Sequence, residues 1–507
     1  MQKFKKALSV MLATALLLTG SSLAFAATDT DYAITNPYAS VDFNTWNQYK
    51  ADLHSHTTFS DGHNTLPEMA ERHYELGFDI YAITDHGTNS IGYTTQEFNT
   101  AMEVVSVIKN DGEHHDEVLS SSGTAANGNA YKVETVNGDE YYTQTLANGD
   151  GQSMMRVPFG IEHNPTSFNN AHVNSWFVNY GTGIVGGTSN YIAPISKVQE
   201  LGGVSVINHP GEYTNARDEV YTADAYNIEN THYKYVINKY ANILKTYDTC
   251  IGIDINSKGD TRTRFDRKLW DILLQKVVPS GRNVFAIGST DAHNLDIVDS
   301  GYTVVLMPEL TSPALKTALK TGSFFAASKY IGNVDELAGY SATLLASENS
   351  EAVEFGKELA ECVETINTEI AENGSQGTKY KVEDGFAAPK VTNIVVDDTE
   401  DTIAITAENA LLVHWIADGK VIATGSEIDL DDYSDVIGSY VRAEILGKGG
   451  ILYSEPFTLD YDGAPAEEDD GNFVDFGTLA SLICDTPVKF LVFLIKPIAK
   501  VILGIIF

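Results

Sequence analysis

The stretch Tyr81-Ala82-Ile83-Thr84-Asp85-His86 joins a short apolar run to a polar cluster. The same pattern recurs where Val204-Ser205-Val206-Ile207 precedes Asn208-His209, and where Val284-Phe285-Ala286-Ile287 precedes Gly288-Ser289-Thr290-Asp291. Each apolar run is typical of a buried parallel strand with its polar residues at the C-terminal end. A barrel-like α/β enzyme collects its active site from distant sequence in this way.

Helix signals alternate with these strands. Asn64-Thr65-Leu66-Pro67-Glu68 is typical of a helix start, with Pro67 in the first turn, and Gly77 is typical of its end. The alternation of strands and helices supports the α/β class.

Histidines and carboxylates gather at the polar ends. Asp52-Leu53-His54-Ser55-His56 comes first, Gly160-Ile161-Glu162 and His172 lie in the middle, and Asp291-Ala292-His293 comes last. Imidazole and carboxylate are the ligands of zinc, manganese and iron. Any one of these histidines is more simply a buried or surface residue, but the whole set in this order indicates a metal site.

These motifs resemble those of the polymerase and histidinol phosphatase (PHP) superfamily of metal-dependent hydrolases, with HxH, TDH, GxE, HP and DxH in the same order. The resemblance covers roughly residues 49–325 and implies a distorted (β/α)7 TIM-like barrel with two or three divalent ions of Zn, Mn or Fe. Gly301-Tyr302-Thr303-Val304-Val305 and Thr321-Gly322-Ser323-Phe324-Phe325-Ala326 more loosely resemble the secreted branch related to carbamate-ester hydrolases.

The resemblance also implies the metal ligands, residue by residue. It places one ion on His54, His56, Glu162 and Asp291, a second on Glu162, His172 and His209, and a third on Asp61, His86 and His293. His63 is an alternative to Asp61. His163 competes with His172, but it follows Glu162 directly and would point to the opposite face of a strand.

The expected chemistry is hydrolysis by a metal-activated water, which needs no serine or cysteine nucleophile. Asp52 and Asp85 stand beside ligand histidines, and we expect them to accept the second imidazole N–H and fix its tautomer. His293 or His86 is a candidate proton donor to the leaving group. Asp85 and His293 are therefore candidate catalytic residues.

A basic run follows the strand-like Ile251-Gly252-Ile253-Asp254-Ile255-Asn256. It contains Lys258, Arg262, Arg264, Arg267 and Lys268. A loop after a barrel strand faces the mouth of the active site, and arginine suits phosphate, so Arg262 and Arg264 are candidate substrate-binding residues. The alternative is a solvated helix start with Asp260 and Asp266 as partners.

The first 26 residues predict a secretory signal peptide. Lys3, Lys5 and Lys6 precede an apolar run that ends in Ala24-Phe25-Ala26. Removing these three lysines changes the formal charge from −36 to −39. So acidic a surface disfavours long nucleic acids, whereas a small anionic or ester substrate remains compatible with a local basic patch. Cys250, Cys362 and Cys484 are too few and too scattered for a disulfide framework.

The length predicts several parts. We expect the barrel over 27–332, with 111–152 as an insertion or lid that holds a hairpin at Asn137-Gly138. A helical connector over 333–388, a small immunoglobulin-like β-sandwich over 389–460 and an acidic linker over 461–472 follow.

Residues 473–507 form a hydrophobic or amphipathic tail. Lys489, Lys496 and Lys500 share one side of a helical wheel. We expect this tail to form a helix that lies on anionic lipid, because a spanning helix would have to place lysines near the bilayer centre at a cost in free energy. A spanning helix is the second alternative, and a tail folded onto the protein is the third.

These features predict an exported enzyme at the outer face of the cytoplasmic membrane, most simply a phosphoesterase. Hydrolysis of carboxylic or carbamate esters or amides is the alternative within enzymes, and a metal-stabilised surface-binding module is the alternative outside them. The sequence leaves the oligomeric state open.

Overall fold

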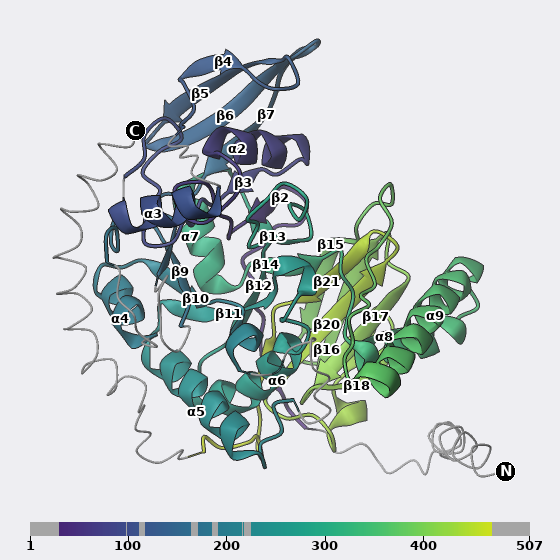
Figure 1. Ribbon diagram of the computed structural model, residues 1–507. Coiled ribbons are helices and arrows are strands. Elements are labelled where there is room, and N and C mark those ends of the chain that lie inside the picture. The colour runs from purple at the N-terminus through teal and green to yellow at the C-terminus, as the bar shows by residue number, and fades with distance from the viewer. Residues whose placement is uncertain are drawn as a thin grey trace.

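The computed structural model describes residues 30–97, 99–110, 117–163, 171–184, 191–214, 216 and 225–468. Its described part is an α/β protein with mixed sheets, in which helices surround the strands on one side and a group of antiparallel strands lies on the other (Figure 1). The coarse fold class predicted from the sequence is therefore confirmed.

The large sheet contains the strands that carry the first two motifs. Strand β2 (Asn47–Asp52) pairs in parallel with β3 (Ile80–Tyr81), and β3 pairs in parallel with β7 (Gly149–Arg156). On its other side β2 pairs antiparallel with β13 (Gly301–Met307), which pairs antiparallel with β14 (Phe324–Ser328). Strands far apart in the sequence thus lie side by side.

A second sheet carries the remaining motifs. Its order is β12-β11-β10-β9-β8, formed by β8 (Ile161–His163), β9 (Val173–Trp176), β10 (Val204–Ile207), β11 (Cys250–Asn256) and β12 (Phe285–Gly288). Strands β10, β11 and β12 are parallel, whereas β8 and β9 are antiparallel neighbours. All residues of these strands are buried, as expected for strands covered on both faces.

Two single bridges connect the sheets at the ends of their strands. Ser55, after β2, bridges Ala292, after β12, and His86, after β3, bridges Glu162 in β8. No continuous hydrogen-bonded barrel closes among the described strands, so the closed TIM-like detail is not confirmed. The metal-ligand motifs lie at these two junctions, because each motif directly follows or occupies a strand end.

The helices follow local sequence rules. Helix α2 (Leu66–Glu75) starts within the predicted stretch 64–68. The side chains of its N-cap Thr65 and of Glu68 form a capping box, and Gly77 follows the helix with a φ of 75°. The other helices beside the two sheets are α3 (Thr100–Lys109), α4 (Ile192–Glu200), α5 (Thr231–Thr246), α6 (Asp266–Val277) and α7 (Ser312–Thr321).

Short 3-10 turns punctuate the loops. They are η1 (Pro210–Tyr213), η2 (Lys258–Asp260), η3 (Val278–Ser280) and η4 (Asp431–Tyr433). The first two follow β10 and β11 and bring residues to the motif end of the second sheet.

The predicted insertion contains an antiparallel arm. Strand β4 (Ser122–Thr124) pairs with β5 (Ala130–Val136), which pairs with β6 (Asp139–Leu146), and β6 pairs with β7. Asn137 and Gly138 connect β5 to β6 with φ values of 54° and 98°, so the hairpin is confirmed. Figure 1 shows this arm projecting from one end of the molecule.

The connector contains α8 (Val334–Leu345) and α9 (Ser350–Asn373), so its predicted helical character is confirmed. Eight further strands follow: β15 (Lys390–Asp397), β16 (Thr402–Glu408), β17 (Leu412–Ala417), β18 (Lys420–Thr424), β19 (Glu427–Asp429), β20 (Tyr440–Gly447), β21 (Gly450–Ser454) and β22 (Phe457–Asp460).

The prediction of a separate β-sandwich is not confirmed. Strands β15, β16 and β19 form a sheet of their own, but β21 pairs with β14, and β22 pairs with β1 (Ala33–Thr35) near the start of the described chain. The C-terminal strands therefore extend the large sheet. Alternating hydrophobicity indicates which face of a strand is buried, but it does not identify the strand's partner.

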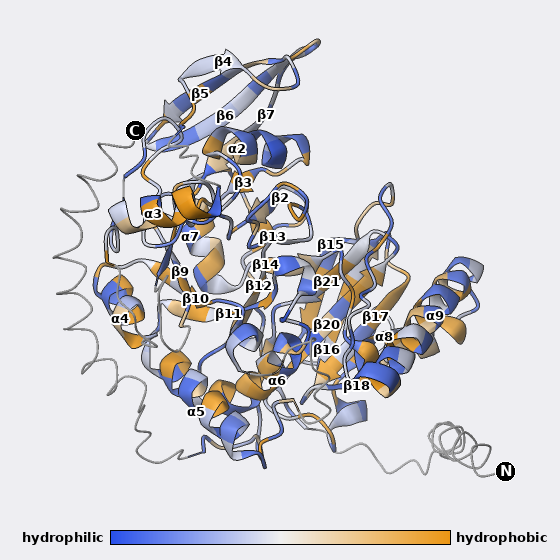
Figure 2. Cartoon of the chain, in the orientation of Figure 1, coloured by the Kyte–Doolittle hydropathy of each residue, from blue (hydrophilic) through white to orange (hydrophobic). Residues whose placement is uncertain are grey.

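Apolar residues fill the space between the layers, and the central strands are largely hydrophobic while α9 carries a hydrophilic face (Figure 2). The described residues contain no helix long and apolar enough to cross a membrane. The predicted signal peptide (1–26), the tail (473–507) and Cys484 lie outside the described residues.

Candidate metal centre

The strand ends bring distant motifs together. His54 and His56 follow β2, His86 follows β3, Glu162 lies in β8, His172 directly precedes β9, His209 follows β10, and Asp291 and His293 follow β12. Asp61 lies in the loop between β2 and α2. These nine residues, all predicted metal ligands, lie in one cluster: eight of them form three overlapping groups, and the ninth, His209, lies beside Glu162.

The first group surrounds Asp291. His56 Nε2 lies 3.0 Å and His54 Nε2 lies 3.4 Å from Asp291 Oδ1. The same two nitrogens lie 3.2 and 3.3 Å from Glu162 Oε2. All four side chains are buried, and their ligand atoms lie within 4.8 Å of one another. This group matches the first predicted ligand set.

The second group surrounds the other oxygen of Glu162. Its Oε1 lies 2.9 Å from His172 Nδ1 and 3.2 Å from His209 Nε2, and it accepts a 2.8 Å hydrogen bond from Asn208 Nδ2. His86 Nδ1 lies 3.2 Å from Oε2 of the same carboxylate. Glu162 therefore contacts both neighbouring groups, as a bridging ligand would.

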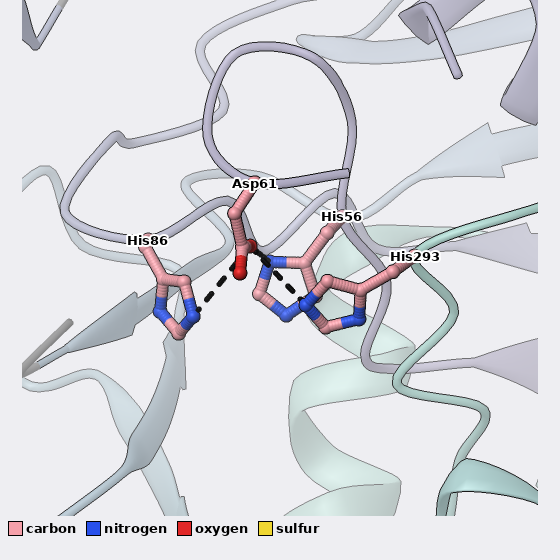
Figure 3. A group of neighbouring side chains, drawn as sticks. All are labelled: His56, Asp61, His86 and His293. Carbon is pink, nitrogen blue, oxygen red and sulfur yellow. Dashed lines mark ion pairs between the residues drawn. The ribbon is translucent and has the colours of Figure 1, made fainter. Parts of the chain in front are cut away.

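The third group surrounds Asp61, on the side of the cluster drawn in Figure 3. Asp61 Oδ1 lies 3.1 Å from His293 Nε2 and 3.7 Å from both His86 Nε2 and His56 Nδ1. His56 thus turns one ring nitrogen toward each of two groups. The predicted third ligand set lies together here, with His56 as an additional member.

The donor atoms fit divalent cations. Oδ1 of Asp291 and Oδ1 of Asp61 are buried, and no described residue gives them a well-oriented hydrogen bond, whereas Oδ2 of Asp291 has the ammonium of Lys258 at 3.0 Å. Buried carboxylate oxygens require such a partner or a cation. Nitrogen and oxygen atoms in these small groups suit Zn, Mn or Fe.

The electrostatics lead to the same conclusion. Burial alone would raise the pKa of Asp291 and of Glu162. Lys258 and His54 nevertheless hold the pKa of Asp291 well below the usual range. His172 and His54 do the same for the pKa of Glu162. Burial also opposes protonation of His56, but the same two carboxylates hold its pKa well above the usual value. The centre demands positive charge, which bound cations would supply.

Asp52 and Asp85 have a different role from the predicted one. Asp85 accepts hydrogen bonds from Thr57 N (2.8 Å), Thr57 Oγ1 (2.6 Å) and Ser60 Oγ (2.6 Å), so it fixes the loop that carries Asp61. Asp52 accepts from His54 N at 3.1 Å and lies 2.9 Å from Nε2 of the buried His73. Neither carboxylate hydrogen-bonds to a ligand imidazole among the described residues. The prediction is corrected because Asp85 is occupied by Thr57 and Ser60, and Asp52 lies against His73.

The alternative ligands lie elsewhere. His163 is buried on the other face of β8, with Nε2 2.7 Å from Ser175 Oγ. His63 is exposed and belongs to none of the three groups. The geometry therefore favours His172 and Asp61.

A pair of cations borders the centre. Lys258 Nζ lies 3.0 Å from Asp291 Oδ2 and 2.7 Å from Glu212 Oε2, and Arg262 Nη1 lies 2.8 Å from Glu212 Oε1. Glu212 Oε2 also lies 3.3 Å from His209 Nδ1. Lys258 and Arg262 both have positive φ, 51° and 67°, in a loop that turns back toward the centre.

The sequence analysis included Lys258 in the basic run without making it a candidate site residue, and it did not name Glu212 or Tyr213. The Tyr213 hydroxyl lies 3.2 Å from His172 Nε2. Lys258 carried a usable signal, since it lies two residues beyond the end of β11. Glu212 and Tyr213 lie in the turn after His209, and nothing in their sequence context distinguishes them from ordinary turn residues.

Arg264 lies away from this border. Its side chain is 1% exposed, and Nη2 donates to the carbonyl of Gly377, after α9, at 3.2 Å. The structure thus corrects the prediction that Arg264 contacts substrate. The positive φ of Arg262 turns the chain between the two arginines, so their proximity in sequence does not bring them to one site.

Residues 52–256 match the PHP domain family. His54 through His209 lie inside the matched PHP domain, whereas Asp291 and His293 come to the centre from beyond it. This chain is also similar to a two-domain protein of Bacteroides vulgatus described as containing a predicted PHP-like metal-dependent phosphoesterase, at 14% identity over 82% of this chain and 88% of that one, with a TM-score of 0.34.

A second similar structure is a lesion-specific endonuclease of Pyrococcus furiosus, at 12% identity over 65% of this chain and 84% of that one, with a TM-score of 0.29. Both similarities are distant. No curated protein matches this chain.

Proposed function

We propose that this protein is an exported, metal-dependent phosphoesterase that hydrolyses a phosphomonoester or phosphodiester. One observation carries the proposal: His56, His86 and Glu162 are each shared between two of the three ligand groups. A structural metal site is closed and serves one ion. Ligands shared between adjacent groups suit a hydrolytic centre with two or three ions.

The chemistry divides between the ions and the protein. His54, His56, Asp61, His86, Glu162, His172, His209, Asp291 and His293 would hold the ions, which when bound supply Lewis-acid activation of water and of the ester. His293 is 22% exposed and lies at the edge of the third group, so it is the candidate that donates a proton to the leaving group.

Lys258 and Arg262 favour a phosphoester over an acyl ester. Their ammonium and guanidinium groups converge at the border of the centre, where they would bind the anionic oxygens of a phosphate. Carboxylic or carbamate esters and amides are the second candidates, because the same ions activate water toward either electrophile. A net charge of −36 disfavours long nucleic acids.

A substrate panel tests the proposed function. We expect protein reconstituted with Zn, Mn or Fe to hydrolyse phosphomonoesters or phosphodiesters at least tenfold faster, in kcat/KM, than matched acyl and carbamate esters. Chelation should abolish the activity, and returning the metal should restore it. Faster cleavage of an acyl or carbamate ester would show that the substrate is not a phosphoester. A protein that contains its metal ions but hydrolyses none of these esters would favour a non-catalytic, surface-binding module.

We further propose that the protein is exported and lies at the outer face of the membrane through residues 473–507. The support is the signal-like composition of residues 1–26 and the lysines at 489, 496 and 500 within an apolar tail. The attraction of each lysine to anionic lipid would contribute roughly 1 kcal/mol to the free energy of membrane binding.

Deleting residues 473–507 is expected to release an active enzyme from the membrane fraction, because the described strands end at Asp460. High salt, or glutamate at Lys489, Lys496 and Lys500, should detach the full chain. Extraction by detergent alone would favour a spanning segment, and full-length protein that stays soluble without lipid would contradict both membrane interpretations.

A further inference from the structure

A cavity of about 380 Å³ lies between α6, α8 and the strands β17, β18 and β20. None of the nine candidate metal ligands lines it. Figure 1 shows these helices beside the C-terminal strands, across the molecule from the projecting β5–β6 arm. The cavity is therefore a different site from the metal centre.

Its floor carries excess negative charge. Arg442 donates to Asp271 through Nε (2.8 Å) and Nη2 (2.7 Å), and to Glu444 Oε1 through Nη1 (2.8 Å). The two carboxylates, each 5% exposed, thus share one guanidinium. Tyr440 and Tyr340 hydroxyls donate to Asp271 and Glu444, but they contribute no charge. A buried carboxylate in excess is costly without a cation.

The walls add to this excess. Five carboxylates and two cations line the cavity. Glu336 is neutralised by Arg267 behind the wall, at 2.9 Å, yet the remaining carboxylates still outnumber Lys268 and Arg442. Burial raises the pKa of Asp418 and the nearby Asp271 adds to the rise, although Lys420 partly opposes it.

His414 supplies an unused acceptor. It is 1% exposed and lines the cavity, with Nε2 3.0 Å from Thr343 Oγ1. The Thr343 hydroxyl donates to the Gly339 carbonyl at 3.2 Å, so its oxygen must accept from His414 Nε2–H. Nδ1 then carries the lone pair, and it has no hydrogen-bond partner among the described residues. A buried acceptor of this kind calls for a donor.

Strand β17 and the turn after it place hydrogen-bond acceptors at two positions on the cavity side. His414, Ile416 and Asp418 alternate along β17 and its turn, so all three face the cavity. Glu444 lies opposite His414 in the ladder, and Arg442 lies opposite Ile416. The apolar Ile416 thus lies between His414 and Asp418, whose backbones are at most about 13 Å apart at ~3.3 Å per residue. Glu444 lies beside His414 at one end and Asp271 belongs to the other, and these two carboxylates are closer together because both bind the guanidinium of Arg442.

We propose that this cavity binds a linear aliphatic diamine, with one ammonium group at His414 and Glu444 and the other at Asp418 and Asp271. The methylene chain would pack on Ile416 and Ile272. A monoamine would satisfy one end only, a diol would leave the carboxylates uncompensated, and a dicarboxylate would be repelled.

Calorimetry and thermal unfolding of the full chain test this with 1,5-diaminopentane, pentylamine, 1,5-pentanediol and glutarate at constant ionic strength. The metal-depleted protein and its metal-loaded form should both bind one diaminopentane at the site, at least tenfold more tightly than pentylamine, with no saturable binding of the diol or glutarate. Equal binding of the diol or glutarate, or no saturable diamine binding at millimolar concentration, would overturn the proposal.

The variants separate this site from general attraction of amines to an acidic surface. D418N should reduce diamine affinity at least tenfold, to that of pentylamine, whereas D435N removes the same charge from an exposed position outside the cavity and should change nothing. G438A keeps every charge, but a Cβ there would lie 2.6 Å from Asp418 Oδ1 and displace it, so it should weaken the diamine as well. Equal effects of D418N and D435N would contradict the site.

Discussion

Replacing Glu162 by alanine is expected to remove more than one metal ion per chain and to lower kcat/KM by at least about a thousandfold, since metal stabilisation supplies several kcal/mol and each 1.36 kcal/mol is tenfold. The reason is the contact pattern of its carboxylate. Oε2 lies 3.2 to 3.3 Å from nitrogens of His54, His56 and His86, and Oε1 lies 2.9 and 3.2 Å from His172 and His209.

Metal analysis by mass spectrometry is the primary readout, because it does not depend on knowing the substrate. Wild-type protein purified without chelators should contain two or three ions of Zn, Mn or Fe. Glu336→Ala is a matched control: it removes a carboxylate whose partner is Arg267, outside the centre, and should cost stability without metal loss. The proposal of a centre with shared ligands would be refuted if wild-type protein contained at most one metal ion per chain, or if Glu162→Ala contained as many ions as wild type.

The site was largely predictable because its chemistry follows strand ends. Strand β10 has the predicted bounds, and the predicted run before Asp291 differs from β12 by one residue at each end. Parallel strands of a sheet present their C-terminal ends at one edge, so polar residues after such strands meet whatever their distance in sequence. His172 and His163 were separated by the same logic, since adjacent residues of a strand point to opposite faces.

The fold was less predictable where pairing between strands decides it. The alternation over 389–460 correctly indicated strands, and the turn at Asp418-Gly419 has the positive φ values, 49° and 71°, of a tight hairpin. Yet every residue of β20 is buried, because this strand lies inside the large sheet, between β22 and β21, and both of its faces are covered. Strand β21 pairs with its neighbour β20 on one side and with β14, more than a hundred residues earlier, on the other, and no local pattern encodes the second pairing.

Loop geometry accounts for the remaining differences. Lys258, Gly259 and Asp260 all have positive φ, which L-residues adopt only when surrounding contacts hold them. These contacts include Glu212 with Lys258 and Arg267 with Asp260. Because the side-chain direction in such a loop depends on these tertiary contacts, sequence spacing could not separate Arg262, at the centre, from Arg264.

The second large effect is expected at Lys258, in the same loop. Lys258→Met is expected to lower kcat/KM for the best phosphoester about tenfold to a hundredfold, the worth of a hydrogen bond to a charged group at ~1.5–3 kcal/mol. Methionine keeps the length of the side chain and removes its charge. Arg262→Ala should raise KM by a similar or smaller factor, because its guanidinium reaches the border through Glu212.

Arg264→Met is the control from the same basic run. Its side chain is buried beside the segment after α9, so the change should lower the melting temperature and leave kcat/KM of the folded protein unchanged. Metal content should be unchanged in all three variants, since none of these residues is a ligand. Cleavage of a phosphoester at wild-type kcat/KM by both Lys258→Met and Arg262→Ala would exclude the cation pair from substrate recognition. An uncharged acyl ester would then be the better candidate, because the metal centre can activate it without any cation at the border.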